Sequence, residues 1–432
     1  MSAASALIYE VVATNVLLFY FVRSSYSIAT VLSIFLFGLG LGSFLIYQFS
    51  SRIRNPQLIF GFLQILIGSY AFFVFGSLIN ITPKFASHGI IYTSVVLLLI
   101  PTICLGAIFP LAGQIYKKEN RNTIGLIYFI DIIGAVAGSL AAGFWLIPVL
   151  GNTNTILIGA VLNIFSATII APKKLKIIPL VLFLGIVYFF GPKYYQKTLA
   201  YDVKFLASSP YGEIKVVKHT LTIDGRVQCR YDSDNNQGVN VVENEIKNLG
   251  ENPKILNIGL GCGGTLTSLT NLTNEKVDVV EINPVVVEAT RKFSDSLNSS
   301  KVNLIIDDGL KYLAKTDKKY DVIVMVIDDP QALASTDLYT SNAFKIYQAR
   351  LDQNGFFTFL PIIQDVYCLD VFYYSLRDVF PYVYLENKDF QQMFLASLQK
   401  KDLSDYLPNH ITDINSLDRN VLQKCYSNRL KL

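Results

Sequence analysis

The sequence is poor in the residues that build metal centres and disulfide frameworks. It has three histidines and five cysteines in 432 residues, and no two cysteines form a Cys-x-x-Cys pair. Zinc sites and disulfide-rich domains are recognised by closely spaced cysteines and histidines. We therefore expect neither a metal site nor a disulfide framework. The five cysteines are Cys104, Cys229, Cys262, Cys368 and Cys425.

Charged residues are also scarce. They make up 16% of the chain, against 52% for hydrophobic residues, and the formal net charge is +4. This small charge is not gathered into a basic stripe, which argues against nucleic-acid binding. The first residues lack a basic segment followed by a small-residue cleavage site, so we expect no removable signal peptide. The apolar excess lies in residues 1–191 and predicts a membrane domain of about seven helices.

Apolar runs close to the length of a membrane span occupy this region, although the last one is short. They are residues 4–22, 28–48, 57–80, 89–115, 124–149, 153–171 and 177–190. Glycines at spacings that predict close helix packing are Gly38, Gly40, Gly42, Gly134, Gly138 and Gly143. Glu10 and Asp131 lie inside two runs, where a carboxylate is costly and faces a partner or a wet cavity. Their role is either functional or in helix pairing.

The basic residues of the connecting loops alternate between two sides. Those of one side are Arg52, Arg54, Lys117, Lys118, Arg121, Lys173, Lys174 and Lys176, and the other side has Arg23 and Lys84. The positive-inside rule places the first set and the N-terminus in the cytoplasm. If all seven runs cross, the C-terminal half lies outside the cytoplasm. If the short run at 177–190 does not cross, that half lies inside, and the sequence leaves both arrangements open.

A glycine-dense turn follows a short apolar run in the C-terminal half. Residues 255–258 predict a buried strand, residues 259–264 are Gly-Leu-Gly-Cys-Gly-Gly, and a second strand at 277–280 ends in Glu281. This order of strand, glycine-rich loop, helix, strand and acid is typical of nucleoside-binding doubly wound sheets. The spacing of the glycines does not fit the Gly-x-Gly-x-x-Gly pattern of dinucleotide dehydrogenases. The stretch therefore predicts a nucleoside site.

Strands and helices alternate from residue 254 to residue 360, which predicts a mostly parallel sheet covered by helices on both faces. The remaining strands are expected at 302–306, 321–326 and 355–360. Strands here end in acids, namely Glu281, Asp307 with Asp308, and Asp328 with Asp329. Because ligands bind beyond the carboxyl ends of such strands, these acids predict the polar rim of a pocket.

The fold class is therefore a multipass α-helical membrane domain followed by an α/β Rossmann-like domain of the class I methyltransferase type. Short strands around a turn at Asp224-Gly225 predict a small β-hairpin subdomain before it. The predicted boundaries are 1–191 for the membrane domain, 200–248 for the β subdomain, 249–400 for the Rossmann-like domain and 401–432 for a polar tail.

Residues 205–400 resemble the spermidine synthase family of polyamine aminopropyltransferases. The stretches that carry the resemblance are SPYGEI, IDGRVQ, IGLGCGG, VVEINP, IDDGLKYL and YDVIVMVIDDP. The first half is similar to the membrane portion of multipass proteins with a fused spermidine synthase-like domain, in ALIYE, FLFGLGLGS, GAIFPLAGQIY and DIIGAVAGSLAAGFWLIPVLG. The resemblance implies that the loop, through Gly259, Gly261 and Gly263, holds decarboxylated S-adenosylmethionine. It assigns the ribose to Glu281 and the adenine to Asp308.

The amine half of the family pattern is altered. The loop Asp of the family is Cys262, its Tyr-Gln step is Tyr211-Gly212, and its Asp-Ser-Ser-Asp-Pro motif is Val326-Ile327-Asp328-Asp329-Pro330. The first Asp of that motif deprotonates the attacking amine, which Val326 cannot do. The resemblance leaves Tyr211 and Asp329 to bind the amine substrate and Asp328 or Asp329 to act as the base.

Several functions remain open at this point. The resemblance implies an aminopropyltransferase that acts on a diamine such as putrescine, without a metal. The alternatives are a methyltransferase that uses S-adenosylmethionine, and an inactive domain with a binding or scaffolding role. A polyamine transporter would rest on Glu10 and Asp131. The expected partners are the lipid bilayer, a small amine, and either a second copy or an envelope-complex protein, and the expected location is the inner cell membrane.

Overall fold

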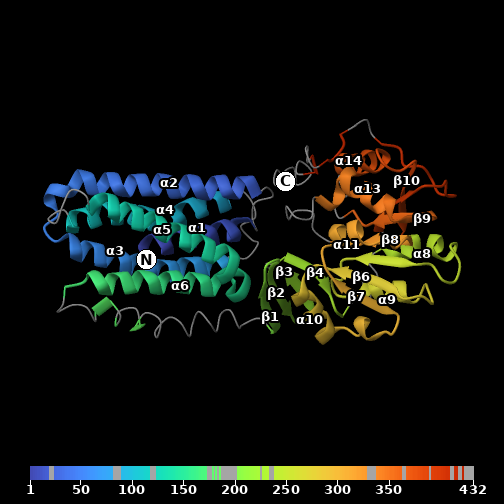
Figure 1. Ribbon diagram of the computed structural model, residues 1–432, viewed down its shortest axis with the longest axis horizontal. Helices are drawn as coiled ribbons and strands as arrows, with labels where there is room; N and C mark the ends of the chain where they lie inside the picture. The colour runs from blue at the N-terminus through green and yellow to red at the C-terminus, as the bar shows by residue number, and fades with distance from the viewer. Residues whose placement is uncertain are drawn as a thin grey trace. The chain divides into compact units, whose positions relative to one another are not determined.

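The structure is a computed structural model of the full chain. It describes residues 1–18, 24–80, 89–116, 123–172, 178–179, 181, 184–185, 202–223, 226–232, 238–327, 337–361, 366–388, 391–408, 413–416 and 421–422. The chain divides into two compact units, Met1–Asp202 with Ser208–Gly212, and Val203–Ala207 with Glu213–Leu432 (Figure 1). Each unit is described by itself.

The first unit is helical. Its helices are α1 (Ser2–Leu18), α2 (Ser24–Phe49), α3 (Pro56–Asn80), α4 (Gly89–Tyr116), α5 (Thr123–Ala141) and α6 (Ile147–Ile170). A π-helical turn, Ala142–Leu146, joins α5 to α6, and Gly151 then breaks the helix with φ 76°. These helices overlap the predicted runs before residue 172. The run at 177–190 falls mostly outside the described residues.

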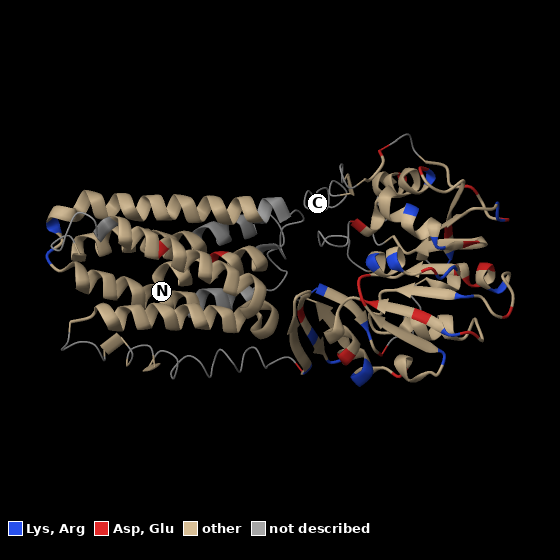
Figure 2. Cartoon of the chain, viewed as in Figure 1, with Lys and Arg blue, Asp and Glu red and all other residues tan. Residues whose placement is uncertain are grey.

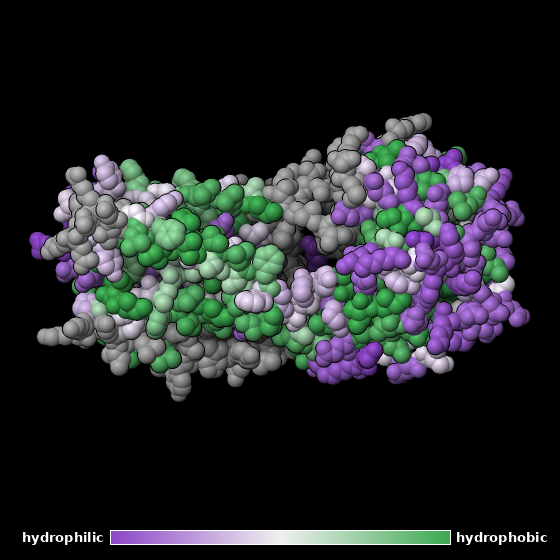
Figure 3. All heavy atoms as spheres, in the orientation of Figure 1, coloured by the Kyte–Doolittle hydropathy of each residue, from purple (hydrophilic) through white to green (hydrophobic). Residues whose placement is uncertain are grey.

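By length and composition, three helical segments among the described residues could cross a membrane. They are Ile28–Arg52, Leu97–Tyr116 and Gly125–Ile170. Figure 2 shows few charged residues along the helices of this unit, and Figure 3 shows that the visible face of the helices is largely hydrophobic. Passage of these helices through a bilayer stays a prediction. Glu10 in α1 and Asp131 in α5 are half-buried, and their roles also stay predictions.

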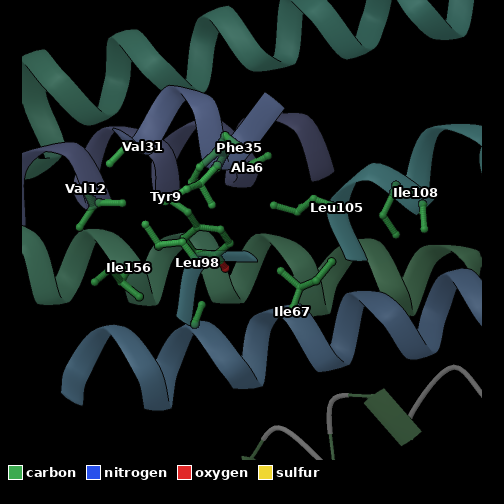
Figure 4. Close-up of a cluster of buried hydrophobic side chains, with 14 of the residues drawn as sticks. Ala6, Tyr9, Val12, Val31, Phe35, Ile67, Leu98, Leu105, Ile108 and Ile156 are labelled. Carbon is green, nitrogen blue, oxygen red and sulfur yellow. The ribbon is translucent and has the colours of Figure 1, made fainter. Parts of the chain in front are cut away.

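Glycines allow the helices of this unit to pack closely, as the spacing predicts for some of them. A Cβ atom on Gly42 would overlap the backbone of Ile103, and one on Gly138 would overlap the backbone of Ala4. The prediction is wrong for Gly40 and Gly143, where an added Cβ would meet nothing within 4 Å. Buried side chains from α1, α2, α3, α4 and α6 form one hydrophobic cluster in this unit, which includes Tyr9, Phe35, Ile67, Leu98 and Ile156 (Figure 4).

The second unit begins with a four-stranded sheet in the order β1-β2-β3-β4. Its strands are β1 (Val203–Ser209), β2 (Gly212–Val217), β3 (Thr220–Ile223) and β4 (Arg226–Arg230). The strands β3 and β4 pair antiparallel, with Thr220 opposite Arg230. This pairing confirms the predicted hairpin, while its turn at Asp224-Gly225 lies outside the described residues.

The main sheet has seven strands in the order β10-β11-β9-β8-β5-β6-β7. Its strands are β5 (Ile255–Ile258), β6 (Val277–Glu281), β7 (Val302–Ile306), β8 (Tyr320–Met325), β9 (Leu351–Phe359), β10 (Tyr382–Lys388) and β11 (Gln391–Ser397). The strands β5 to β9 are parallel to their neighbours, and β10 and β11 are added antiparallel. The order reverses at β5, so its carboxyl end is the switch point where such sheets bind ligands.

Helices connect these strands, as the alternating pattern predicts. They are α8 (Val239–Lys247), α9 (Gly264–Thr270), α10 (Pro284–Phe293), α11 (Gly309–Lys315), α13 (Ser341–Ala349) and α14 (Val366–Arg377). The C-terminal part is thus a Rossmann-like α/β fold of the methyltransferase type. Part of the segment after residue 400 also packs on it, because Asn415 is fully buried and its side chain donates to the backbone oxygen of Tyr339, 3.0 Å away.

Candidate nucleoside-binding site

The glycine-rich loop follows β5 directly and has a backbone that only glycine adopts easily. Gly259, Gly261 and Gly263 have φ values of 90°, 52° and 83°. A Cβ atom on Gly259 would overlap the backbone oxygen of Val326, and one on Gly263 would overlap the Ser296 hydroxyl. Two physical needs, a left-handed backbone and close approach of neighbours, therefore account for these glycines.

Glu281 lies at the carboxyl end of β6, against this loop. The backbone N–H of Leu260 donates to its Oε2 at 2.9 Å, and that of Asn283 donates to its Oε1 at 2.8 Å. Burial raises the pKa of Glu281, and these backbone hydrogen bonds offset only part of the effect. The structure thus brings together the loop and the acid that the sequence pairs.

The Asp308-Gly309 step follows β7 and lies beside the same point. Oδ1 of Asp308 accepts a hydrogen bond from the backbone N–H of Lys311 at 3.0 Å and so caps α11. A Cβ atom on Gly309 would lie 2.7 Å from Cγ2 of Ile258, the last residue of β5. The ends of β5, β6 and β7 therefore gather Gly259–Gly263, Glu281 and Asp308 at one edge of the sheet.

The structure describes only some of the residues that the sequence assigns to the amine half of the site. Val326 follows β8, its backbone N–H donates to the oxygen of Ile258 at 2.9 Å, and it is 8% exposed. Tyr211 lies in the turn between β1 and β2 and is 48% exposed. Asp328 and Asp329 lie outside the described residues. The roles predicted for Tyr211, Asp328 and Asp329 therefore stay predictions.

The expectation that the chain has no disulfide framework is wrong. Cys229 in β4 and Cys262 in the glycine-rich loop form a disulfide across 33 positions of the sequence, and Cys368 in α14 is also disulfide-bonded. Among the described cysteines, Cys104 is a free thiol. No spacing rule could have found the first pair, because it forms only when the small sheet packs on the Rossmann-like fold.

Sequence reasoning also missed three polar residues that hold the loop. The hydroxyl of Thr290 in α10 donates to the backbone oxygen of Gly261 at 2.7 Å. The hydroxyl of Tyr231 lies 3.2 Å from the Thr290 hydroxyl. The side chain of Asn257, fully buried within β5, donates to the backbone oxygen of Gly259 at 2.9 Å. Asn257 had a visible signal, since it is the one polar residue in the buried run 255–258.

A family model matches the part of the chain that contains this loop and these acids. Residues 239–368 match the model of the spermine/spermidine synthase domain. This part of the chain is similar to that domain, and we refer to residues 239–368 as the spermidine synthase-like domain. The match includes the glycine-rich loop, Glu281, Asp308 and Val326, and leaves out the helical unit and Tyr211.

Curated relatives also match parts of this chain. A polyamine aminopropyltransferase of Methanocaldococcus jannaschii is 42% identical over 104 residues, which are 22% of this chain and 35% of that protein. Polyamine aminopropyltransferase 2 of Aquifex aeolicus is 23% identical over 277 residues, 59% of this chain and 56% of that protein. The chain thus spans between about a third and a little more than half of the length of these two relatives.

A solved structure also matches. Spermidine synthase from Thermotoga maritima is 22% identical and aligns with a TM-score of 0.41, over 54% of this chain and 84% of that one. Within the described residues of the present protein, no group of three or more His, Cys, Asp or Glu side chains is placed to hold a metal ion.

Proposed function

We propose that the spermidine synthase-like domain binds decarboxylated S-adenosylmethionine and transfers its aminopropyl group to a diamine such as putrescine. The observation that carries the proposal is the convergence of the glycine-rich loop, Glu281 and Asp308 at the carboxyl ends of β5, β6 and β7. The match of residues 239–368 and the names of the relatives supply the substrate class. The helical unit is proposed to anchor this domain in the cell membrane, in contact with lipid.

The site would hold three parts of the ligand, which are its sulfonium end, its ribose and its adenine. The loop backbone approaches the sulfonium side of the ligand, the Glu281 carboxylate accepts hydrogen bonds from the ribose hydroxyls, and Asp308 accepts one from the adenine amino group. The position of Glu281 supports its share, because two backbone N–H groups fix its carboxylate beside the loop.

The transfer needs an unprotonated amine. Its nitrogen attacks the propyl carbon next to the sulfonium, the carbon–sulfur bond breaks, and the electron pair goes to sulfur, which leaves as methylthioadenosine. The new ammonium then releases one proton. Alkylamines have a pKa near that of lysine, about 10.4, and are mostly protonated at neutral pH, so a carboxylate must take a proton from the substrate. We assign the removal of the proton from the substrate amine to Asp328, and the binding of that amine to Asp329.

Release of methylthioadenosine tests the proposal. The full-length protein in detergent is mixed with decarboxylated S-adenosylmethionine and putrescine. Asp328→Asn should lower kcat by about 100-fold or more, since general base catalysis contributes that much. Asp329→Asn should instead raise the KM for putrescine, because it removes the charge that binds the amine. Both variants should leave the affinity for the nucleoside unchanged. Glu288→Gln, which changes an exposed acid on α10, should leave kcat, KM and this affinity unchanged.

A second candidate is a domain that binds the nucleoside without transferring the group. The side chain of Val326 favours it, because this buried apolar residue stands where the family has the amine-activating carboxylate. Tight binding of decarboxylated S-adenosylmethionine by the wild type, with no methylthioadenosine above the uncatalysed background, would support the second candidate and exclude the first.

A further inference from the structure

We propose that the spermidine synthase-like domain faces the oxidising, non-cytoplasmic side of the membrane, where the Cys229–Cys262 disulfide fixes the loop of its nucleoside site. The inference takes the identity of the ligand from the proposed function. Its other grounds are the disulfide, the contacts around it and the charges of the membrane loops.

The disulfide joins the small sheet to the loop at the point where the loop would approach a ligand. Cys262 lies between Gly261 and Gly263, and a Cβ atom on Gly261 would be 3.6 Å from Sγ of Cys229. Both sulfurs are buried in one apolar cluster with Ile214, Leu221 and Ala289. A bond at this position removes freedom from the loop before any ligand arrives.

Noncovalent contacts hold the same junction. Tyr231, two residues after Cys229, packs its ring 5.5 Å from that of Phe293 in α10, and its hydroxyl meets Thr290, which donates to Gly261. The loop is thus tied to β4 by a covalent bond and to α10 by a hydrogen bond. A loop already held in its binding conformation loses little entropy when a ligand binds.

The disulfide also indicates the compartment. Forming it removes two protons and two electrons from the thiols, and these pass to a disulfide of a protein oxidant, which becomes a dithiol. Structural disulfides persist in oxidising compartments and are rare in the cytosol. Cys368 is disulfide-bonded as well, so two separate places in the unit carry the same indication.

The loop charges indicate the same side independently. The basic loops at Arg52 and Arg54, at Lys117, Lys118 and Arg121, and at Lys173, Lys174 and Lys176 fall on alternate connections and are therefore cytoplasmic. The apolar run at 177–190 comes directly after the last of them and would carry the chain to the opposite side. An adenosyl sulfonium made in the cytoplasm would then have to reach that side.

The first measurement is the thiol state of the protein in membranes quenched with acid, for the wild type and for Cys229→Ala with Cys262→Ala. Before reduction, the wild type and the double variant should add the same number of maleimide labels. After reduction, the wild type should add two labels more than the double variant. In right-side-out vesicles, a membrane-impermeant phosphine and an impermeant maleimide should label these two positions of the wild type. Two extra labels before reduction, or labelling only after lysis, would overturn the inference.

The second measurement is the affinity of the full-length protein for decarboxylated S-adenosylmethionine. The double variant should bind about tenfold more weakly or worse, because ordering even one backbone residue on binding costs about that factor. Cys368→Ala, which also removes a disulfide, and Cys104→Ala should bind as the wild type does. Thermal melting shows whether each variant is folded. If the double variant does not fold, reduction and reoxidation of the folded wild type replace it, and the affinity should fall and recover.

The outcomes separate the two proposals. Equal affinity of the oxidised wild type and a folded double variant would overturn the positioning role of the disulfide. An intact external disulfide in a wild type that binds no decarboxylated S-adenosylmethionine would overturn the proposed function and leave the location standing.

Discussion

The strand β6 carries a buried acid near each end, and the two acids have opposite environments. Asp278, near its amino end, accepts hydrogen bonds from the side chains of Lys318, Tyr320, Tyr312 and Asn303. Although burial raises the pKa of Asp278, the bonds from Lys318, Asn303 and Tyr320 bring it below its usual value. Glu281, at the carboxyl end, accepts from backbone N–H groups, and its pKa is raised by burial.

The difference separates a structural edge of the sheet from a ligand-binding edge. A carboxylate has about four acceptor positions, and Asp278 receives four side-chain donors, from three elements and the loop before β8. The described contacts of Glu281 leave room for hydroxyl donors from a ligand. Four predictions test whether one edge determines the stability of the fold and the other the binding of the nucleoside.

The largest effect is expected at Gly259. Replacing it with Ala puts a Cβ atom into the backbone of Val326 at φ 90°, so we expect a loss of about 3 kcal/mol or more in the free energy of unfolding, and no measurable nucleoside binding. Gly250→Ala is the matched control, because φ is 104° there and nothing lies within 4 Å of the added atom. It should cost about 1 kcal/mol. Equal urea midpoints for the two variants would contradict the packing described at Gly259.

Asp278→Asn should affect stability and leave binding intact. Removing the charge weakens bonds to Lys318 and Tyr320 in a buried site, at a cost of about 2 kcal/mol at pH 7. Since the pKa of Asp278 is lowered on folding, its contribution is present above its unfolded pKa of about 3.9 and is lost as the pH falls through the folded value. Urea unfolding at several pH values measures this. A loss of nucleoside affinity would mean that the two edges are not independent.

Glu281→Gln should do the reverse. We expect the affinity for decarboxylated S-adenosylmethionine to fall about tenfold, because a charge-assisted hydrogen bond to ribose is replaced by a neutral one. The raised pKa means that wild-type affinity declines with falling pH earlier than an ordinary Glu, of pKa about 4.3, would make it. It also means that stability tied to the protonated form is lost as the pH rises through the folded pKa, so Gln should be tolerated within about 1 kcal/mol at neutral pH. Titration calorimetry measures the affinity and scanning calorimetry the stability, with Glu288→Gln as the control variant.

Lys318→Met should have the smallest effect. Nζ of Lys318 is 2.8 Å from Asp278, but the lysine side chain is 57% exposed, so solvent screens the pair. We expect a loss of about 0.5 kcal/mol that shrinks at high salt, and no change in binding. Lys315→Met, on the exposed end of α11, is the control. A loss that does not depend on salt would contradict the assignment of this stability to the charge pair.

Local patterns predicted much of the second unit. The strands at 255–258 and 302–306 agree with β5 and β7, and the acid after 277–280 agrees with the end of β6. Periodicity and glycine spacing suffice there, because each element is set by its own residues and near neighbours. The antiparallel pair β10 and β11 carried no such signal and was not predicted.

Features made by distant parts of the chain were out of reach. The Cys229–Cys262 bond, and the contact of Thr290 with Gly261, exist because the small sheet and α10 fold onto the loop. Cys262 stood out in the sequence as a replacement for an acid, and only the fold gives it a partner. The acids at 328 and 329 fall outside the described residues, so their place at the site still rests on the motif.

Hydrogen exchange of the full-length oxidised protein, with and without decarboxylated S-adenosylmethionine, tests the central claim most directly. Binding at the carboxyl edge of the sheet should slow the exchange of backbone amides in 259–264, 281–283 and 308–309. The amides around Asp278, Asn303 and Tyr320 at the other edge should exchange as before. Protection at the second set without the first, or no protection at either in a protein whose disulfide is intact, would contradict the account.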